Sequence, residues 1–246
     1  MLVLHSRSEI QHSQNMKKKL AVFDFDDTII NRSPEYKNFF GMTTLLPDQD
    51  FAELFSKNCQ DKVWTISEAW EIFNDKTNVT KEDIIDALVK CVSVVKGMVQ
   101  VLDELSHEHD LIMISHNDLG LIDPLLNNFK LQHYFKKVFA KPSVITKEGK
   151  FKKFKIPETW SGVCNNEPIN HCKTLNLKEF LQENHGYDQI IYFGDGENDY
   201  CPAEFLSSND KIFPRRDFPL EKVLNQKPVQ AQVFAWSDGY DILKFI

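Results

Sequence analysis

Three short apolar runs in the chain each end in polar residues. They cover residues 19–25, 111–115 and 189–195. A continuous apolar run of this length is typical of a strand that is buried on both faces, as in a parallel sheet. Because parallel strands end at the same edge of a sheet, we expect the polar residues that follow the runs to lie close together.

Segments with helical spacing separate these runs. Apolar residues three and four positions apart predict helices over 98–107, 119–129 and 175–184, with Thr174 as candidate N-cap of the last. Strands that alternate with helices predict an α/β fold, in which helices cover both faces of a parallel sheet.

One long stretch breaks this alternation. From residue 34 to residue 95 the apolar residues recur at helical spacings, and no segment has the pattern of a convincing strand. We therefore expect a helical insert of roughly 60 residues that covers the site as a lid. Residues 1–18 are then a loose N-terminal tail, and residues 19–33 and 96–246 form the core. A Glu148-Gly149 turn between β-prone segments also predicts a hairpin within 144–156.

Composition and charge narrow the class of protein. The 246 residues are 42% hydrophobic and 26% charged, which is ordinary for a globular protein and not for a disordered or fibrous one. No apolar run approaches the ~20 residues that span a bilayer, and the first residues have too short an apolar stretch and the wrong order of charge to predict a signal peptide. A net charge of −7 argues against a general affinity for nucleic acid or anionic membranes. Five scattered cysteines favour reduced thiols and the cytoplasm, while the oligomeric state is left open.

The strongest chemical signal is the pair Asp24 and Asp26 at the end of the first predicted strand. Residues two apart in an extended backbone face the same side, so both carboxylates can reach one site while Phe25 points into the core. A carboxylate can attack phosphorus when a divalent cation screens the charge repulsion, and a second one can transfer the protons. The alternative is an acidic turn with a solvated or capping role.

A second signal follows the third predicted strand, where Gly194 and Gly196 flank Asp195. Glycines let the backbone turn tightly and approach an ion, and Asp195 would be an oxygen ligand of the kind that Mg²⁺ prefers. Asp199 would hold a metal-bound water or the loop itself. A Gly- and Asp-rich turn is the alternative, and a calcium loop is disfavoured because the closing Glu is missing.

Two single residues add weaker signals. Ser115 ends the second predicted strand, and its hydroxyl can either donate to a phosphate oxygen or cap the following helix. Lys173 can neutralise a phosphate and a carboxylate, or it is an ordinary exposed lysine. Cys164, His171 and Cys172 suggest zinc, but they contain no C-x-x-C pair and no fourth ligand is evident, so ordinary thiols are favoured.

In this order, the four signals resemble the motifs of the haloacid dehalogenase (HAD) superfamily: Asp-x-Asp-x-Thr, a strand-end Ser, a Lys before a helix, and Gly-Asp-x-x-x-Asp. The resemblance implies a Rossmann-like three-layer core with a parallel sheet, a Mg²⁺ cofactor, and a helical type-1 cap inserted after the first strand. It implies Asp24 as nucleophile and Asp26 as general acid and base. The implied phosphate ligands are Thr28, Ser115 and Lys173, and the implied metal site contains Asp24, Asp26, Asp195 and Asp199.

Longer segments resemble the group of phosphoethanolamine/phosphocholine phosphatases and pyridoxal phosphate phosphatases. They are residues 22–26, 97–98, 172–173, 194–202 and 213–216. Two positions depart from that group. Glu35 stands where it usually has Asp, and His116 replaces the Asp that usually follows the strand-end Ser.

If both side chains face the substrate, this mixed pair would attract a cationic amine less than two acids would. The alternative for His116 is that it points away and caps the next helix. The sequence thus predicts a Mg²⁺-dependent phosphatase that hydrolyses a small phosphomonoester through an aspartyl-phosphate. Phosphoethanolamine, phosphocholine and pyridoxal phosphate are the substrates that the resemblance implies. The alternatives are a phosphatase for another small metabolite, such as phosphoserine, and a non-catalytic binding protein on the same fold.

Overall fold

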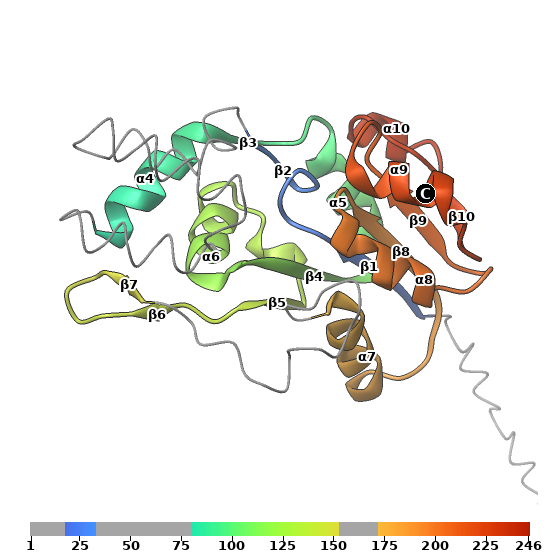
Figure 1. Ribbon diagram of the computed structural model, residues 1–246, viewed down its shortest axis with the longest axis horizontal. Coiled ribbons are helices and arrows are strands. Elements are labelled where there is room, and N and C mark those ends of the chain that lie inside the picture. The colour runs from blue at the N-terminus through green and yellow to red at the C-terminus, as the bar shows by residue number, and fades with distance from the viewer. Residues whose placement is uncertain (1–17, 33–79, 153–171) are drawn as a thin grey trace, which may run out of the picture.

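A six-stranded parallel sheet forms the centre of the computed structural model, which describes residues 18–32, 80–152 and 172–246 (Figure 1). The strand order is β10-β9-β8-β1-β4-β5. The bounds of these strands are β1 Lys18–Phe23, β4 His109–Asp118, β5 Lys137–Lys141, β8 Tyr187–Gly194, β9 Lys211–Pro214 and β10 Gln232–Val233. The three apolar runs of the sequence are thus three adjacent strands of the sheet, β8, β1 and β4, and their prediction as buried strands is confirmed.

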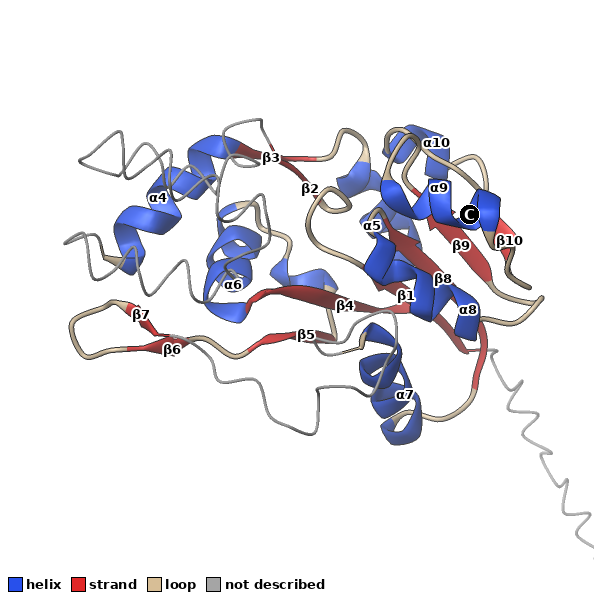
Figure 2. Ribbon diagram, viewed as in Figure 1, coloured by secondary structure: helices blue, strands red, loops and turns tan. Residues whose placement is uncertain are grey.

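Helices cover both faces of this sheet, as Figure 2 shows. One layer contains α5 Met98–Ser106, α6 Leu119–Asn128 and α10 Gly239–Ile242. The other contains α7 Lys173–Glu183, α8 Tyr200–Phe205 and α9 Pro219–Gln226. Two short 3₁₀ helices, η2 Gln132–Tyr134 and η3 Glu197–Asp199, complete the core.

The two helical layers pack on alternate residues of the same strands. In β1, Ala21 and Phe23 belong to the hydrophobic cluster beneath α5 and α6, whereas Leu20 and Val22 belong to the cluster beneath α7 and α9. Successive side chains of a strand point to opposite faces, so a fully apolar strand is what a three-layer fold requires. The predicted α/β architecture is therefore confirmed.

Helix α7 starts earlier than the sequence pattern indicated. Its N-cap is Cys172, which places Thr174 inside the helix, and the helical segment begins at Lys173. The apolar periodicity missed the first two residues because Lys173, a charged residue, is fully buried there. Its burial depends on acidic partners from other elements, which a local pattern cannot reveal.

Part of the predicted helical insert is described. Helix α4 spans Lys81–Cys91 and begins with a capping box between Thr80 and Asp83. Directly after it, β3 Val92–Val94 pairs antiparallel with β2 Ile30–Arg32. The expectation that 34–95 contains no strand was therefore wrong at its end, where two β-branched valines alternate with a serine. Most of the insert and the tail lie outside the described residues, so the division into domains stays a prediction.

The predicted hairpin is present, with β6 Val144–Ile145 antiparallel to β7 Phe151–Lys152. Gly149 in its turn has a φ of 78°, which glycine adopts without steric cost. The Gly149 carbonyl accepts a hydrogen bond of 2.9 Å from the backbone N–H of Lys81, at the start of α4. The hairpin therefore connects the core to the described part of the insert.

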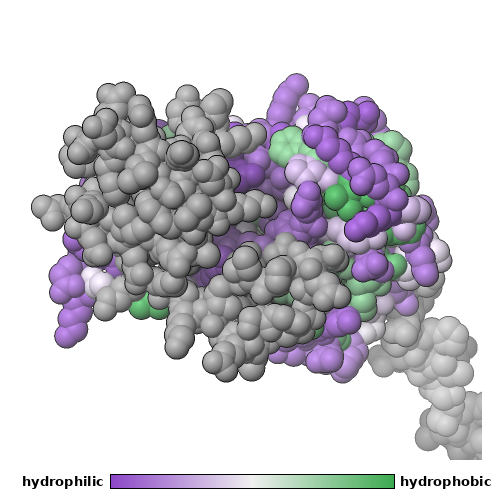
Figure 3. Space-filling model, in the orientation of Figure 1, coloured by the Kyte–Doolittle hydropathy of each residue, from purple (hydrophilic) through white to green (hydrophobic). Residues whose placement is uncertain are grey.

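On the face seen in Figure 3, most described residues are hydrophilic and the hydrophobic ones form small separate patches. No helix within 18–32, 80–152 or 172–246 is long and apolar enough to cross a membrane. Most of the large apolar side chains in this part of the chain are thus buried between the sheet and its two helical layers.

The C-terminal helix α10 packs against the start of α5 through backbone atoms of two glycines, which generates a stability prediction. A Cβ on Gly239 would lie 2.2 Å from the carbonyl carbon of Gly97 and 2.6 Å from the nitrogen of Met98. Gly239→Ala must push these backbones apart, so we expect it to lower the free energy of unfolding by about 2 kcal/mol. Urea denaturation measures this, with the exposed Ser237→Ala in the same turn as control, expected within about 0.5 kcal/mol of the original. Equal effects of the two substitutions would contradict this packing.

Candidate active site

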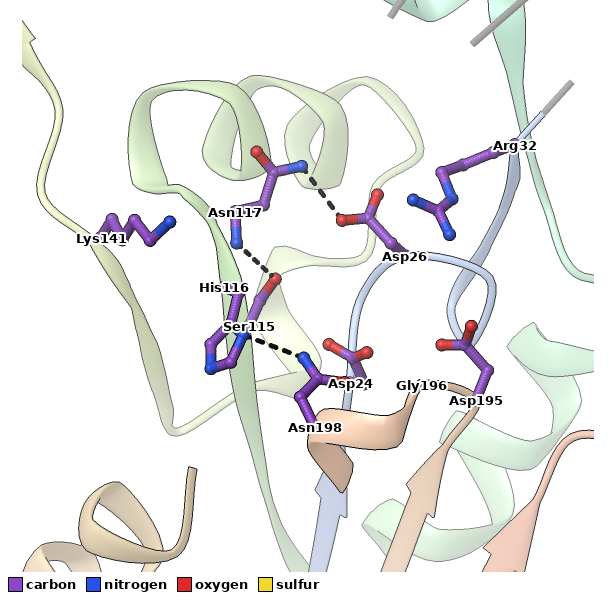
Figure 4. A pocket seen from close by; sticks show the side chains of 10 residues that line it. All are labelled: Asp24, Asp26, Arg32, Ser115, His116, Asn117, Lys141, Asp195, Gly196 and Asn198. Atoms are coloured by element: carbon purple, nitrogen blue, oxygen red, sulfur yellow. Dashed lines mark hydrogen bonds between the residues drawn. The ribbon is translucent and has the colours of Figure 1, made fainter. Parts of the chain in front are cut away.

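The polar residues at the carboxyl ends of β1, β4 and β8 meet around one cavity, as the parallel sheet predicts (Figure 4). Its volume is about 210 Å³. The described residues that line it are Asp24, Asp26, Arg32, Ser115, His116, Asn117, Lys141, Asp195, Gly196 and Asn198. Five predicted site residues from three segments are thus brought together: Asp24, Asp26, Ser115, His116 and Asp195.

Asp24 follows β1 directly and has only 6% of its surface exposed. Its backbone N–H donates to the Phe193 carbonyl of β8, and its Oδ1 accepts a 2.7 Å hydrogen bond from the Phe25 N–H. The Lys173 ammonium lies 3.0 Å from the same Oδ1. Both of these side-chain contacts involve Oδ1. Among the described residues, Oδ2 is therefore the oxygen available for a reaction in the cavity.

Lys173 and Asp199 form a fully buried ion pair, with 2.7 Å between Nζ and Oδ1. The Tyr192 hydroxyl donates to the same Oδ1, while the backbone N–H groups of Asp195 and Gly196 donate to Oδ2 at 3.1 and 3.0 Å. Asp199 therefore accepts hydrogen bonds from four donors. These contacts fit the expectation that Asp199 holds the loop.

Gly194 makes this arrangement possible. A Cβ at this position would lie 2.5 Å from Cγ of Asp199, well inside contact distance. The glycine before Asp195 is therefore needed for the close approach of the Asp199 carboxylate to the backbone that it holds.

Oxygen atoms of Asp24, Asp195 and Asp199 lie within 4.8 Å of one another, and all three side chains are buried. Burial raises the pKa of Asp24 to about 7, although the Lys173 ammonium opposes the rise. Burial, followed by the charges of Asp24 and Asp199, raises the pKa of Asp195 to about 9. Buried carboxylates that repel one another make a site that a divalent cation with a preference for oxygen would neutralise. The donor set therefore fits Mg²⁺, with Asp24 and Asp195 as the side chains that also line the cavity.

The predicted phosphate ligands occupy two different positions. Ser115 is 1% exposed, and its Oγ accepts the Asn117 N–H at 3.1 Å, so its own proton can be donated into the cavity. Asp118, not Ser115, is the N-cap of α6. Of the predicted phosphate ligands, Thr28 and Lys173 are not among the described residues that line the cavity, and Thr28 Oγ1 donates to Asp195 Oδ1 at 3.4 Å. Both lie behind the carboxylates that they contact.

His116 lines the cavity and does not cap α6, whose N-cap is Asp118. Its Nδ1 lies 2.9 Å from the side-chain nitrogen of Asn198. An amide nitrogen can only donate, so Nδ1 accepts and a neutral His116 carries its proton on Nε2. Glu35, the other predicted substrate residue, lies outside the described residues.

Asp27, which was not among the predicted site residues, fixes the loop after the two site carboxylates. This residue has a φ of 51°, an uncommon conformation for a side chain other than glycine. Its carboxylate accepts hydrogen bonds from Arg32 Nε at 2.9 Å and Nη2 at 2.5 Å, and Arg215 Nη1 donates to its carbonyl at 2.6 Å. A third acid in the motif, directly after Asp26, was the available signal. Its arginine partners could not be identified from spacing.

Asn117 and Lys141 were also overlooked, although both line the cavity and are 3% and 8% exposed. Asn117 Nδ2 donates to Asp26 Oδ2 at 3.2 Å. Lys141 is the last residue of β5 and pairs in register with Asp118 of β4. The polar residues His116 and Asn117, which follow Ser115, were the only sequence signal for the side of the cavity that Asn117 and Lys141 line.

Stability in the absence of metal ions should depend on pH through Asp195. Its folded-state pKa of about 9 exceeds the ordinary value of 3.8, so between these values the folded chain holds a proton that the unfolded chain has released. This stabilising contribution is complete below pH 3.8 and is lost as the pH rises through about 9. Asparagine does not titrate, so Asp195→Asn removes this loss of stability. In the presence of a metal chelator, the Tm of Asp195→Asn should therefore exceed that of the original chain, and the difference should increase with pH.

Added Mg²⁺ should raise the Tm of the original chain and change that of Asp195→Asn much less, because binding to the folded state stabilises it. Asp188→Asn, which changes an exposed acid on the strand that precedes Asp195, is the control and should behave like the original chain. A Tm margin independent of pH would show that Asp195 is not held in the protonated form.

Comparison with known proteins agrees with this site and fold. Pyridoxal phosphate phosphatase PHOSPHO2 of Homo sapiens is 29% identical over 243 residues, which cover 93% of this chain and 97% of the relative. Phosphoethanolamine/phosphocholine phosphatase of Gallus gallus is 27% identical over 249 residues, with coverage of 95% and 90%. A solved phospho-aspartyl intermediate analogue of phosphoserine phosphatase superposes with a TM-score of 0.60 at 19% identity, covering 94% and 99% of the two chains.

The likeness to the solved structure concerns the fold and confirms the HAD-type core. The family model described as Putative Phosphatase matches residues 19–246, which is nearly the whole chain. The chain therefore belongs to the Putative Phosphatase family, and it is a phosphomonoester hydrolase of the HAD type that resembles the phosphoethanolamine/phosphocholine and pyridoxal phosphate phosphatases.

Proposed function

We propose that this chain hydrolyses a small phosphomonoester in two steps through a phosphoryl group on Asp24. The observation that carries the proposal is the position of Asp24. This buried carboxylate contacts Lys173 and the Phe25 N–H through Oδ1, and it lines a cavity together with Asp26 and Ser115. Both contacts at Oδ1 orient the side chain, so Oδ2 is held for attack on phosphorus.

The contacts around Asp24 also support its ionised form. The Lys173 ammonium lowers the pKa that burial raises, and Mg²⁺ bound by Asp24 and Asp195 would add positive charge where a phosphate meets carboxylates. Thr28 contributes by orienting Asp195, and Asp199 by holding the loop that carries it. Asp26 would be a metal ligand as well in the family pattern.

Asp26 is placed to transfer protons in both steps. It lines the cavity two residues after Asp24 and is only partly buried. In the first step it would protonate the oxygen of the departing alcohol. In the second it would accept a proton from the water that attacks the phosphoryl group, which returns the enzyme to its starting state. The Ser115 hydroxyl would donate to a phosphoryl oxygen in both steps.

The substrate is proposed to be small and not strongly cationic. A cavity of about 210 Å³ fits a metabolite. The helical insert expected at 34–95 is proposed to cover it. Arg32, Lys141 and His116 line the cavity together with its acids, so its charge is mixed. Of the substrates in the relatives' names, pyridoxal phosphate fits this charge better than phosphocholine. We expect the enzyme to act in the cytoplasm.

The nucleophile is tested by Asp24→Asn. The amide keeps the shape of the side chain but lacks a nucleophilic oxygen, so hydrolysis of para-nitrophenyl phosphate with Mg²⁺ should fall by at least about 10⁴-fold. Asp199 still pairs with Lys173, so the variant should fold with a lower Tm, and an unchanged far-UV circular dichroism spectrum separates the loss of chemistry from loss of the fold. Retention of substantial activity in a preparation free of contaminating phosphatase would refute the role of Asp24. No activity of the original chain with or without Mg²⁺ would favour a binding protein.

Specificity is tested by His116→Asp, which places an acid on the cavity wall. We expect the ratio of kcat/KM for phosphoethanolamine to that for neutral ethyl phosphate to rise about tenfold, because the new carboxylate attracts the ammonium group of the substrate. His133→Asp adds the same charge at an exposed residue outside the cavity and should leave the ratio unchanged. An unchanged ratio in His116→Asp would show that His116 does not set the choice.

A further inference from the structure

The side-chain amide of Asn117 has a defined orientation. Its Oδ1 accepts a 2.8 Å hydrogen bond from the backbone N–H of Asp118. Because this oxygen must face the N–H donor, the Nδ2 end is the one that faces Asp26, at 3.2 Å from Oδ2. Asn117 is 3% exposed, so its side chain is enclosed by the protein on the remaining sides.

This orientation determines where Asp26 can carry a proton. An amide NH₂ group donates and does not accept, so Asp26 Oδ2 is the acceptor of the hydrogen bond. The proton that Asp26 transfers must then be on Oδ1. Figure 4 shows Asp26 with Asn117 on one side and Arg32 on the other, at the side of the cavity that lies away from Asn198.

Asn117 also contacts the residue that would bind the phosphoryl group. Its backbone N–H donates to Ser115 Oγ at 3.1 Å, while its side chain donates to Asp26. One buried residue on β4 therefore links the hydroxyl of Ser115 to the carboxylate that follows β1. A shift of Asn117 would change the distance between the phosphoryl site and the proton donor.

We propose that Asn117 is a positioning residue, which orients Asp26 so that Oδ1 protonates the alcohol oxygen as the bond to phosphorus breaks. The inference rests on the proposed function, and it concerns alkyl phosphates most. An alkoxide is a poor leaving group and needs the proton, whereas para-nitrophenolate leaves without it. The hydrogen bond from Asn117 thus widens the range of substrates to esters of ordinary alcohols.

The test compares kcat/KM for ethyl phosphate and para-nitrophenyl phosphate, since kcat/KM includes the steps up to release of the alcohol. Asn117→Leu removes both side-chain hydrogen bonds at similar volume. It should lower kcat/KM for ethyl phosphate by about 10 to 100-fold and for para-nitrophenyl phosphate by less than about threefold. A merely structural role would lower both alike. Asn127→Leu, at an exposed position of α6, is the matched control and should change neither.

Two further variants keep the inference testable if Asn117→Leu folds poorly. Asn117→Ala also removes both side-chain hydrogen bonds, with a smaller side chain that fits the same space, so it should show the same dependence on the leaving group. The double variant Asp26→Asn, Asn117→Leu should lose no more activity on ethyl phosphate than Asp26→Asn alone, because the two residues act as one unit. Additive losses would overturn the inference.

The outcomes also separate this inference from the proposed function. Asp26→Asn should itself lower kcat/KM for ethyl phosphate by roughly 10² to 10⁴-fold and affect the aryl ester less. If Asp26→Asn lowers kcat/KM for the two esters by the same factor, Asp26 is not the general acid, and the inference about Asn117 fails as well. If Asp26→Asn behaves as expected and neither Asn117 variant does, Asn117 does not position Asp26 and the proposed function stands.

Discussion

The buried Lys173 ammonium, held between Asp24 and Asp199, is the interaction on which the rest of the site depends. Burial alone would lower the pKa of Lys173, but the charges of Asp199 and Asp24 raise it well above its ordinary value. The charge can stay in the interior only because both acids contact it, and removal of one partner from such a group is strongly destabilising. The loop after β8, Asp24 after β1 and the start of α7 thereby meet at Lys173.

From this point the order of the site extends outward through hydrogen bonds to backbone. Asp199 fixes the N–H groups of Asp195 and Gly196, and Asp195 receives the hydroxyl of Thr28. Burial, and after it the charges of neighbouring acids, raises the pKa values of Asp24 and Asp195, because the ionised carboxylates lack solvent and repel one another. A divalent cation would relieve this repulsion, so the same charges that hold the site together also prepare it for a metal ion.

Much of the fold could be predicted from sequence because the strands of a buried parallel sheet are apolar throughout and end in polar residues. Asp24, Ser115 and Asp195 follow from that rule, and their order along the chain suggested the chemistry. The contacts that complete the site could not be predicted, since Asn117 and Asp26 are 91 residues apart and Arg215 and Asp27 are 188 apart. Local periodicity carries no information on such pairs. It also missed the start of α7 and the strand β3, where burial and pairing with distant residues decide the structure. Glu35 lies outside the described residues, so its position was not tested.

The central claim is that a phosphoryl group is transferred to Asp24 during turnover. The most direct measurement is rapid acid quench of the enzyme with substrate and Mg²⁺, followed by mass spectrometry of its peptides. The account predicts one phosphoryl group on the peptide that contains Asp24 and Asp26, localised to Asp24, which disappears when the substrate is exhausted. A phosphoryl group on another residue during turnover would contradict it. So would an unmodified Asp24 peptide under conditions in which the phosphoryl-enzyme of a related phosphatase is trapped in parallel.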